Sequence, residues 1–185
     1  MMKRYLAFSI LALSWFFSGC AATVYAPPPE GTHLIGNVPF FKQEDYQCGP
    51  SALAGVLNYW YMKRDSSERL SVEEIVAAIY SPSARGVLGI DLENYARHKG
   101  FTTRQFQGSI ADVRTSVDSG TPLILFVEYG FSLYRLDHFV VAKGYTNDSV
   151  IMNSGRKEND IIPNKELLKI WERTGYWSLL IEPSS

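Results

Sequence analysis

Two residues of this chain have the chemistry needed for nucleophilic catalysis. Cys48 lies in the run QCGP at the start of an apolar stretch, and His138 begins the apolar stretch HFVVAKGY much further along. A thiolate is a strong nucleophile, and an imidazole is a suitable group to take up the thiol proton. Together the two residues indicate a pair that attacks a carbonyl carbon.

The residues after Cys48 predict a helix that begins at the nucleophile. Pro50 suits a first helical turn, where the missing N–H costs nothing. Apolar residues then recur at three- and four-residue steps, at Leu53, Val56, Leu57, Trp60 and Tyr61. We expect a helix from about Cys48 to Met62. Its unpaired N–H groups and positive dipole end favour a thiolate, so we expect a thiolate–imidazolium pair with His138.

A catalytic imidazole also needs an orienting residue. The first candidate is Asn153, which ends the strand expected after the His138 strand, across a turn at residues 147–148. Asp137 should point to the opposite sheet face from His138 and ranks lower. Asp160 is a more remote candidate.

An acyl-transfer site must also stabilise the oxyanion. The backbone N–H of Cys48 at the helix start is one candidate donor. Gln43 and Gln47 both carry a suitable side-chain amide. Gln43 is better placed to fold back over the site, because the side chain of Gln47 should diverge from its neighbour. Among the other histidines, His98 stands in the charged run RHK, where a solvated residue is expected.

The N-terminal segment has the features of an export signal. Lys3 and Arg4 precede an apolar run, Tyr5–Phe17, that is too short to span a bilayer comfortably. The ending FSGC resembles the lipobox of bacterial lipoproteins, in which the chain is cut before a cysteine that is then acylated. We expect residues 1–19 to be a signal peptide and Cys20 to be lipidated. The alternative is a plain secretory signal with an incidental cysteine.

Residues 20–33 predict a tether between lipid and domain. They contain three successive prolines among small and polar residues, and end at His33. Ala21 after the lipidated cysteine is typical of lipoproteins sorted to the outer membrane, so we expect an envelope location facing the periplasm. The folded domain should comprise residues 34–185.

Composition limits the remaining classes. With Cys20 acylated, Cys48 has no disulfide partner, and a thiolate-rich zinc site is excluded. The net charge of -1 gives no reason to expect nucleic-acid binding. We expect no metal and no cofactor.

The order of predicted elements indicates an α+β fold. Helices come first, and an antiparallel sheet forms most of the second half. A capping box at Ser71 and Glu74 starts the second helix, and another at Ser109 and Asp112 starts the fourth. The remaining predicted elements are a helix over Ile90–Lys99, a strand over Phe101–Gln107, strands from TPLILFVEYG, Asp137–Thr146, SVIMNSG and YWSLLIE, and a helix starting at Pro163 or Asn164. We expect loops at Ser81–Gly89 and Tyr129–Leu136 that determine specificity.

Three motifs together resemble a known family. The runs QEDYQCGPSAL, DHFVVAKGY and VIMNSG resemble the papain-like cysteine peptidases of the bacteriocin-processing type, which cut after double-glycine leaders. The resemblance implies a papain-like fold, with Cys48 as nucleophile, His138 as base, Asn153 as orienting residue and Gln43 as oxyanion amide. Two features depart from the family. Gln43 is five residues before the nucleophile instead of six, and Asn153-Ser154 replaces the frequent Asp-Pro.

The resemblance spans roughly residues 36–182, but the substrate does not carry over from it. Bacteriocin-processing members are often fused to a transporter, whereas this chain is expected to stand alone on a lipid tether. The leading hypothesis is a lipid-anchored envelope peptidase acting on a peptide or protein, with secretion or assembly machinery as a possible partner. Two alternatives remain: an inactive papain-like binding accessory, and an acyl transferase of transglutaminase or amidase type.

Overall fold

The structure is a computed structural model that describes residues 31–43, 46–83, 86–131 and 134–184. The predicted signal peptide, the lipidation site Cys20 and nearly all of the predicted tether lie outside the described residues. They therefore stay predictions. No helix within the described ranges is both long enough and apolar enough to cross a membrane.

An antiparallel sheet forms the frame of the domain. Its strands are β1 (His33–Leu34), β2 (Phe101–Gln107), β3 (Leu123–Phe131), β4 (Tyr134–Tyr145), β5 (Ser149–Ser154), β6 (Lys157–Pro163) and β7 (Trp177–Pro183). They are ordered β2-β7-β3-β4-β5-β6, and β1 pairs with β4. The sheet is longest at the centre, where the β3–β4 register is regular from Leu123↔Ala142 to Phe131↔Tyr134. This pair carries His138.

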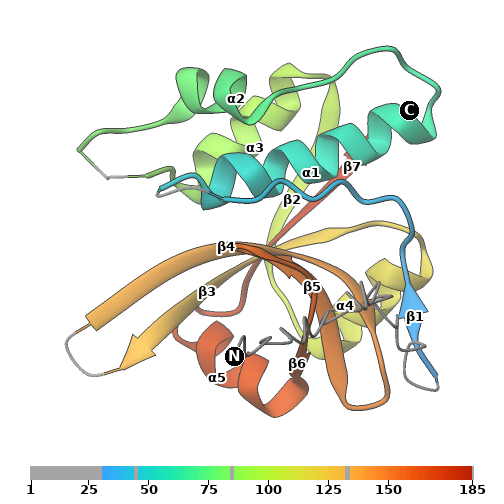
Figure 1. The fold of residues 1–185 in the computed structure, drawn as a ribbon, viewed down its shortest axis with the longest axis vertical. Helices are drawn as coiled ribbons and strands as arrows, with labels where there is room; N and C mark the ends of the chain where they lie inside the picture. The colour runs from blue at the N-terminus through green and yellow to red at the C-terminus, as the bar shows by residue number, and fades with distance from the viewer. Residues whose placement is uncertain (1–30, 44–45, 84–85, 132–133, 185) are drawn as a thin grey trace, which may run out of the picture.

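Helix α1 (Cys48–Lys63) is the central helix of the domain and confirms the predicted element almost to the residue. Every residue from Gly49 to Tyr61 is buried. Small residues permit this packing: a Cβ on Gly55 would lie 2.9 Å from the carbonyl oxygen of Pro39. Figure 1 shows α1 grouped with α2 and α3 on one side, and α5 on the far side of β3 and β4.

The other helices follow their predicted starts. They are α2 (Val72–Ile79), α3 (Gly89–His98), α4 (Ile110–Asp118) and α5 (Asn164–Glu172). The predicted capping box at the start of α2 is confirmed. The Ser71 N–H donates to the Glu74 carboxylate, and the Glu74 N–H donates to the Ser71 hydroxyl. At α4 the Ser109 hydroxyl accepts the Asp112 N–H as expected, but it also donates to the Asp112 carboxylate at 2.5 Å.

Three sequence predictions differ from the structure. Strand β6 was not predicted, because its run KENDIIP is mostly polar and largely exposed. The expected loop at Tyr129–Leu136 is the end of the β3–β4 hairpin, where Tyr129 pairs directly with Leu136. His33 is not part of a free tether but belongs to β1. Its ring stacks on Tyr145 at 4.4 Å, and its Nδ1 lies 3.1 Å from an Asp118 carboxylate oxygen.

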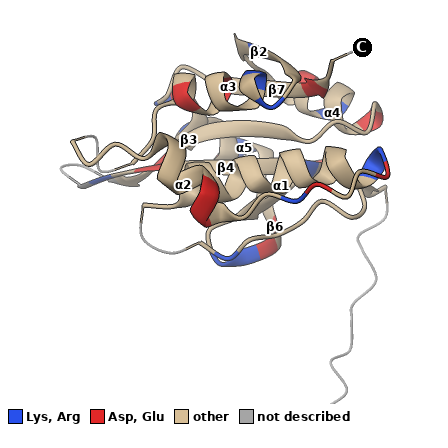
Figure 2. Ribbon diagram, turned by 90° about the horizontal axis from the view of Figure 1, so that it is seen from above, with Lys and Arg blue, Asp and Glu red and all other residues tan. Residues whose placement is uncertain are grey.

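Charges of both signs are interspersed over the described surface. Figure 2 shows acidic and basic positions scattered over the ribbon, with both signs on the hairpin of β6. This distribution agrees with the near-zero net charge of the sequence.

Candidate active site

The N-terminus of α1 lies directly against β4. The Cys48 thiol accepts a hydrogen bond from the backbone N–H of Phe139. The pairs between β4 and β5 begin at Val141, so among the described residues β5 does not bond to this part of the β4 edge. A Cβ on Gly49 would lie 3.3 Å from the Phe139 ring and 2.2 Å from a Val87 methyl, so the helix start approaches too closely for any larger residue. Cys48 therefore lies beside the residue that follows His138.

His138 lies in a half-buried site between β3 and the end of β5. It pairs with Val127 across the hairpin, and its ring centroid is 5.8 Å from that of Tyr129. On its other side is Gly155: a Cβ built on Gly155 would be 3.7 Å from His138 Nε2. Gly155 has a φ of 57°, a left-handed conformation that favours glycine.

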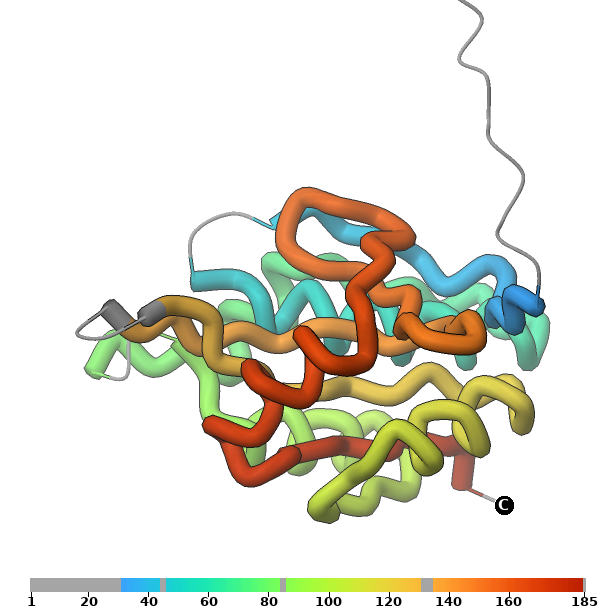
Figure 3. Tube along the Cα trace, turned by 90° about the horizontal axis from the view of Figure 1, so that it is seen from below, coloured from blue at the N-terminus to red at the C-terminus, as the bar shows by residue number. Residues whose placement is uncertain are grey.

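The backbone of Gln43 is hydrogen-bonded to Gly155, the residue beside His138. Its backbone N–H donates to the Gly155 carbonyl at 3.1 Å, and Figure 3 shows the segment before α1 running beside the turn between β5 and β6. The Gln43 side chain is buried, and its Oε1 has no hydrogen-bond partner within the described part of the chain. An unpaired buried amide atom is costly unless another group, such as substrate, completes it.

Gln47 lies elsewhere. It occupies the N-cap position of α1 without a side-chain capping bond. Its side chain lines a separate pocket of about 280 Å³, together with Phe41 and residues at the start of α2. Of the two candidate amides, the structure brings Gln43 to the His138 side of the site.

The structure does not bring the Asn153 side chain to the imidazole. Asn153 pairs with Val141, so the two side chains share one sheet face, whereas His138 is three residues from Val141 and faces the other way. Asn153 Oδ1 instead accepts the backbone N–H of Asn159 at 3.2 Å. Its Nδ2 has no partner among the residues described. Asn153 as the orienting residue remains a sequence prediction, and the strand register argues against it.

The structure also shows the positions of Asp137 and Asp160, the two lower-ranked candidates for the orienting residue. Asp137 is exposed and pairs with Glu128 across the hairpin. Asp160 pairs with Met152 and forms a 3.4 Å ion pair with Lys157. Within the described part of the chain, neither aspartate is hydrogen-bonded to His138.

Burial sets the protonation state of the pair. Burial raises the pKa of the Cys48 thiol, although the N–H groups of Phe139, Gly49 and Cys48 itself act in the opposite direction. Burial also lowers the pKa of His138 to about 4. The free site therefore favours a neutral thiol beside a neutral imidazole near pH 7. Both directions disfavour the charged forms of the two residues, because desolvation opposes the effect of the helix N-terminus, and the thiolate–imidazolium pair stays a prediction.

A tryptophan supports the Phe139 side of the site. The Trp177 ring packs on Phe139 with centroids 5.6 Å apart, and its indole N–H donates to Gln105 Oε1 at 2.8 Å. Gln105 in turn donates to the buried carboxylate of Glu93. The same indole passes so close to Gly89 that a Cβ there would lie 2.4 Å from Trp177 Cζ2.

Three further residues lie around His138. They are Tyr129, Ser154 and Gly155. Ser154 and Gly155 directly follow Asn153 in the motif VIMNSG, but sequence reasoning gave neither of them a role in the site. Tyr129 was expected in a specificity loop and not beside the imidazole.

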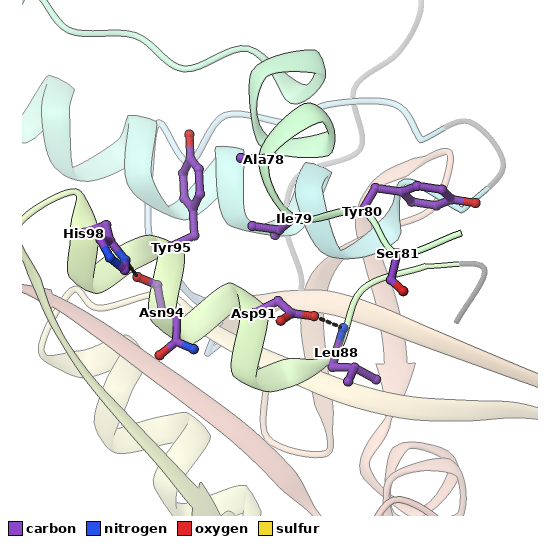
Figure 4. A pocket seen from close by; sticks show the side chains of 9 residues that line it. All are labelled: Ala78, Ile79, Tyr80, Ser81, Leu88, Asp91, Asn94, Tyr95 and His98. Carbon is purple, nitrogen blue, oxygen red and sulfur yellow. Dashed lines mark hydrogen bonds between the residues drawn. The ribbon is translucent and has the colours of Figure 1, made fainter. Parts of the chain in front are cut away.

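A larger pocket lies between α2 and α3. It has a volume of about 490 Å³ and is lined by residues that include Tyr80, Asp91, Tyr95 and His98 (Figure 4). His98 is exposed, as predicted, with its Nδ1 2.7 Å from the Asn94 carbonyl oxygen. Neither Cys48 nor His138 lines this pocket.

A buried helix headed by a cysteine, packed against an antiparallel sheet that carries a histidine, defines the class of papain-like cysteine peptidases. Residues 35–179 match the family model described as the Peptidase_C39 like family, and the chain belongs to that family. No match was found among curated proteins.

Solved structures have the same fold. The peptidase domain of Streptococcus ComA, a bi-functional ABC transporter, is 20% identical with a TM-score of 0.65, over 80% of this chain and 100% of that one. A double glycine motif protease from an AMS/PCAT transporter, in complex with the leader peptide, is 25% identical with a TM-score of 0.61, over 80% and 93%. Xylellain, a cysteine protease from Xylella fastidiosa, is 10% identical with a TM-score of 0.60, over the full length of both chains.

Proposed function

We propose that this protein is a lipid-anchored cysteine peptidase of the bacterial envelope that cleaves a peptide or protein substrate. Cys48 is the nucleophile, His138 the general base and Gln43 the oxyanion donor. The observation that carries the proposal is the position of Cys48: its thiol accepts the N–H of the residue next to His138. The substrate class is supported by the related protease solved with a leader peptide.

The proposed reaction starts from the neutral pair. As the Cys48 sulfur attacks the carbonyl carbon, its proton passes to His138. The oxyanion is held by the Cys48 N–H and the Gln43 amide. The C–N bond then breaks, the amine leaves with the proton from His138, and water hydrolyses the thioester. Asn153 is the orienting residue expected from sequence, but its face of the sheet does not support that role.

Lipid anchoring rests on the N-terminal sequence alone. The run FSGC ends a basic-then-apolar segment, and a proline-rich stretch separates Cys20 from β1. Replacement of Cys20 by Ser should release the full chain from the membrane fraction, whereas an incidental cysteine would leave its distribution unchanged.

The proposed activity is tested with a library of peptides incubated with the full chain and read by mass spectrometry. We expect discrete cleavage products with the natural protein, and none with the Cys48→Ala or His138→Ala variant. Equal cleavage by Cys48→Ala would exclude Cys48 as nucleophile. Absence of cleavage by all three, together with tight binding of a peptide, would favour the inactive binding accessory.

A further inference from the structure

Ser154 lies on the His138 face of the sheet, at the position where an orienting residue is needed. It follows Asn153 on β5, so strand alternation places the two side chains on opposite faces. Asn153 shares its face with Val141, and β4 is regular between Val141 and His138. The bulge in β4 lies beyond Ala142, outside this stretch. His138 and Ser154 therefore face the same side.

A second hydroxyl completes this arrangement. Tyr129 on β3 is two residues from Val127, the direct partner of His138, and so lies on the same face. Its ring lies 5.8 Å from the His138 ring, inclined by 59°. The side chains of Tyr129 and Ser154 are hydrogen-bonded to each other. Tyr129 thus links the imidazole and the serine from the neighbouring strand.

The imidazole is turned toward this end of β5. A Cβ on Gly155, the residue after Ser154, would lie 3.7 Å from His138 Nε2 and 3.9 Å from Cε1. His138 Nε2 is therefore on the side of the Ser154–Gly155 backbone. Asn153, one residue earlier, binds the Asn159 N–H instead, at a residue of β6 with a φ of 55°.

We propose that Ser154, held by Tyr129, positions the His138 imidazole in the role that the sequence predicted for Asn153. The Ser154 hydroxyl accepts the Nε2–H of His138 and donates its own proton to the Tyr129 phenol oxygen. The other ring nitrogen is left free to take the Cys48 proton. Asn153 is a structural residue that binds the Asn159 N–H where the β5–β6 register shifts between Met152 and Ser154. This proposal rests on the proposed function, since it assigns an orienting residue to that same base.

The electrostatics agree with an uncharged partner. Burial is the largest cause of the raised pKa of Tyr129; the hydrogen bond from Ser154 acts in the opposite direction, and the charge of Asp160 raises this pKa by a smaller amount. Burial lowers the pKa of His138. A carboxylate in contact with His138 would have raised that pKa. The titratable groups that act on this site include Cys48 on α1, Tyr129 on β3, Asp137 on β4 and Asp160 on β6.

The test uses two matched carboxylate substitutions that differ only in sheet face. In Ser154→Asp we expect NMR titration to show the His138 pKa raised from about 4 by roughly one to three pH units, because a carboxylate on its face stabilises imidazolium. In Asn153→Asp we expect a much smaller change. A larger rise in Asn153→Asp, equal rises in both, or no rise in Ser154→Asp would overturn the proposal.

A kinetic measurement tests the proposal even if the carboxylate substitutions disturb the fold. We expect Ser154→Ala to slow iodoacetamide alkylation of Cys48 at pH 7 at least about tenfold, because a misaligned base is inefficient. Ser154→Thr, which keeps the hydroxyl, should retain the natural rate, and so should Asn153→Ala. Slow alkylation in Asn153→Ala with a natural rate in Ser154→Ala would reverse the assignment. Neither readout needs peptide cleavage, so a failed peptidase assay and a failed positioning role are distinguishable.

Discussion

The backbone N–H of Gln43 donates a 3.1 Å hydrogen bond to the carbonyl of Gly155. This bond fastens the segment before the nucleophile to the strand end beside the base. It also holds the buried amide of Gln43 on the His138 side of the site, although the segment and the strand end lie far apart in the sequence.

Replacing Gln43 and replacing Gln47 should have very different effects on the kcat of peptide cleavage. We expect Gln43→Ala to lower kcat of peptide cleavage by about 10²–10³, the usual cost of losing one oxyanion donor. Gln47→Ala, at an N-cap that makes no side-chain bond, should stay close to the natural kcat. Steady-state kinetics on any cleaved peptide compare the two variants. The reverse order of losses would assign the oxyanion role to Gln47.

His138 should make stability depend on pH in a definite direction. Its pKa is about 4 in the folded state and 6.5 as the ordinary value, so between these pH values the unfolded chain binds more protons. The free energy of unfolding should therefore fall by up to roughly 3 kcal/mol as pH falls from 6.5 to 4. This contribution is present above pH 6.5 and lost below 4.

Urea unfolding at pH 7 and pH 4 measures this effect against two variants. We expect His138→Gln to remove that part of the pH dependence. His98→Gln, which changes an exposed histidine of α3, should leave it in place. An unchanged pH dependence in His138→Gln would show that the imidazole is not held neutral by burial.

The sequence was sufficient for the helices, and it also predicts the Cys48–His138 pair. The apolar steps after Pro50 located α1, and the capping box located α2, because both signals are local. The side of the sheet that Asn153 faces could not be obtained this way. It depends on the register of β4 with β5, including a bulge that no local pattern reveals, and a shift of one residue reverses every side chain.

Strand β6 and the protonation state of the site could not be predicted either, because both depend on contacts between distant parts of the chain. A mostly polar strand gains its pairing from β5 and not from its own pattern. The effect of a helix N-terminus on Cys48 could be predicted from position, but the burial that opposes it arises from the packing of the whole domain.

The stability of the domain should be sensitive to a side chain at Gly89, because Gly89 lies against Trp177. A methyl at Gly89 would lie 2.4 Å from Trp177 Cζ2, and the indole packs on Phe139 beside the base. We expect Gly89→Ala to lower the free energy of unfolding by about 1–3 kcal/mol and to reduce cleavage. Thermal or urea unfolding measures the first effect.

Gly36 provides the matched control. A Cβ at Gly36 would meet no atom within 4 Å. We expect Gly36→Ala to change the unfolding free energy by no more than about 0.5 kcal/mol. Equal effects of the two substitutions would mean that the indole does not restrict Gly89.

The central claim is that His138 activates Cys48, and the most direct measurement is the rate of iodoacetamide alkylation of Cys48 against pH. Mass spectrometry of the Cys48 peptide follows the reaction in the natural full chain and in His138→Ala. Because His138 stays neutral down to about pH 4 and accepts the thiol proton, we predict a steady alkylation rate between about pH 5 and 8 in the natural chain. His138→Ala should lose this plateau and react only as the thiol itself ionises at high pH. Identical profiles for the two proteins would contradict the account.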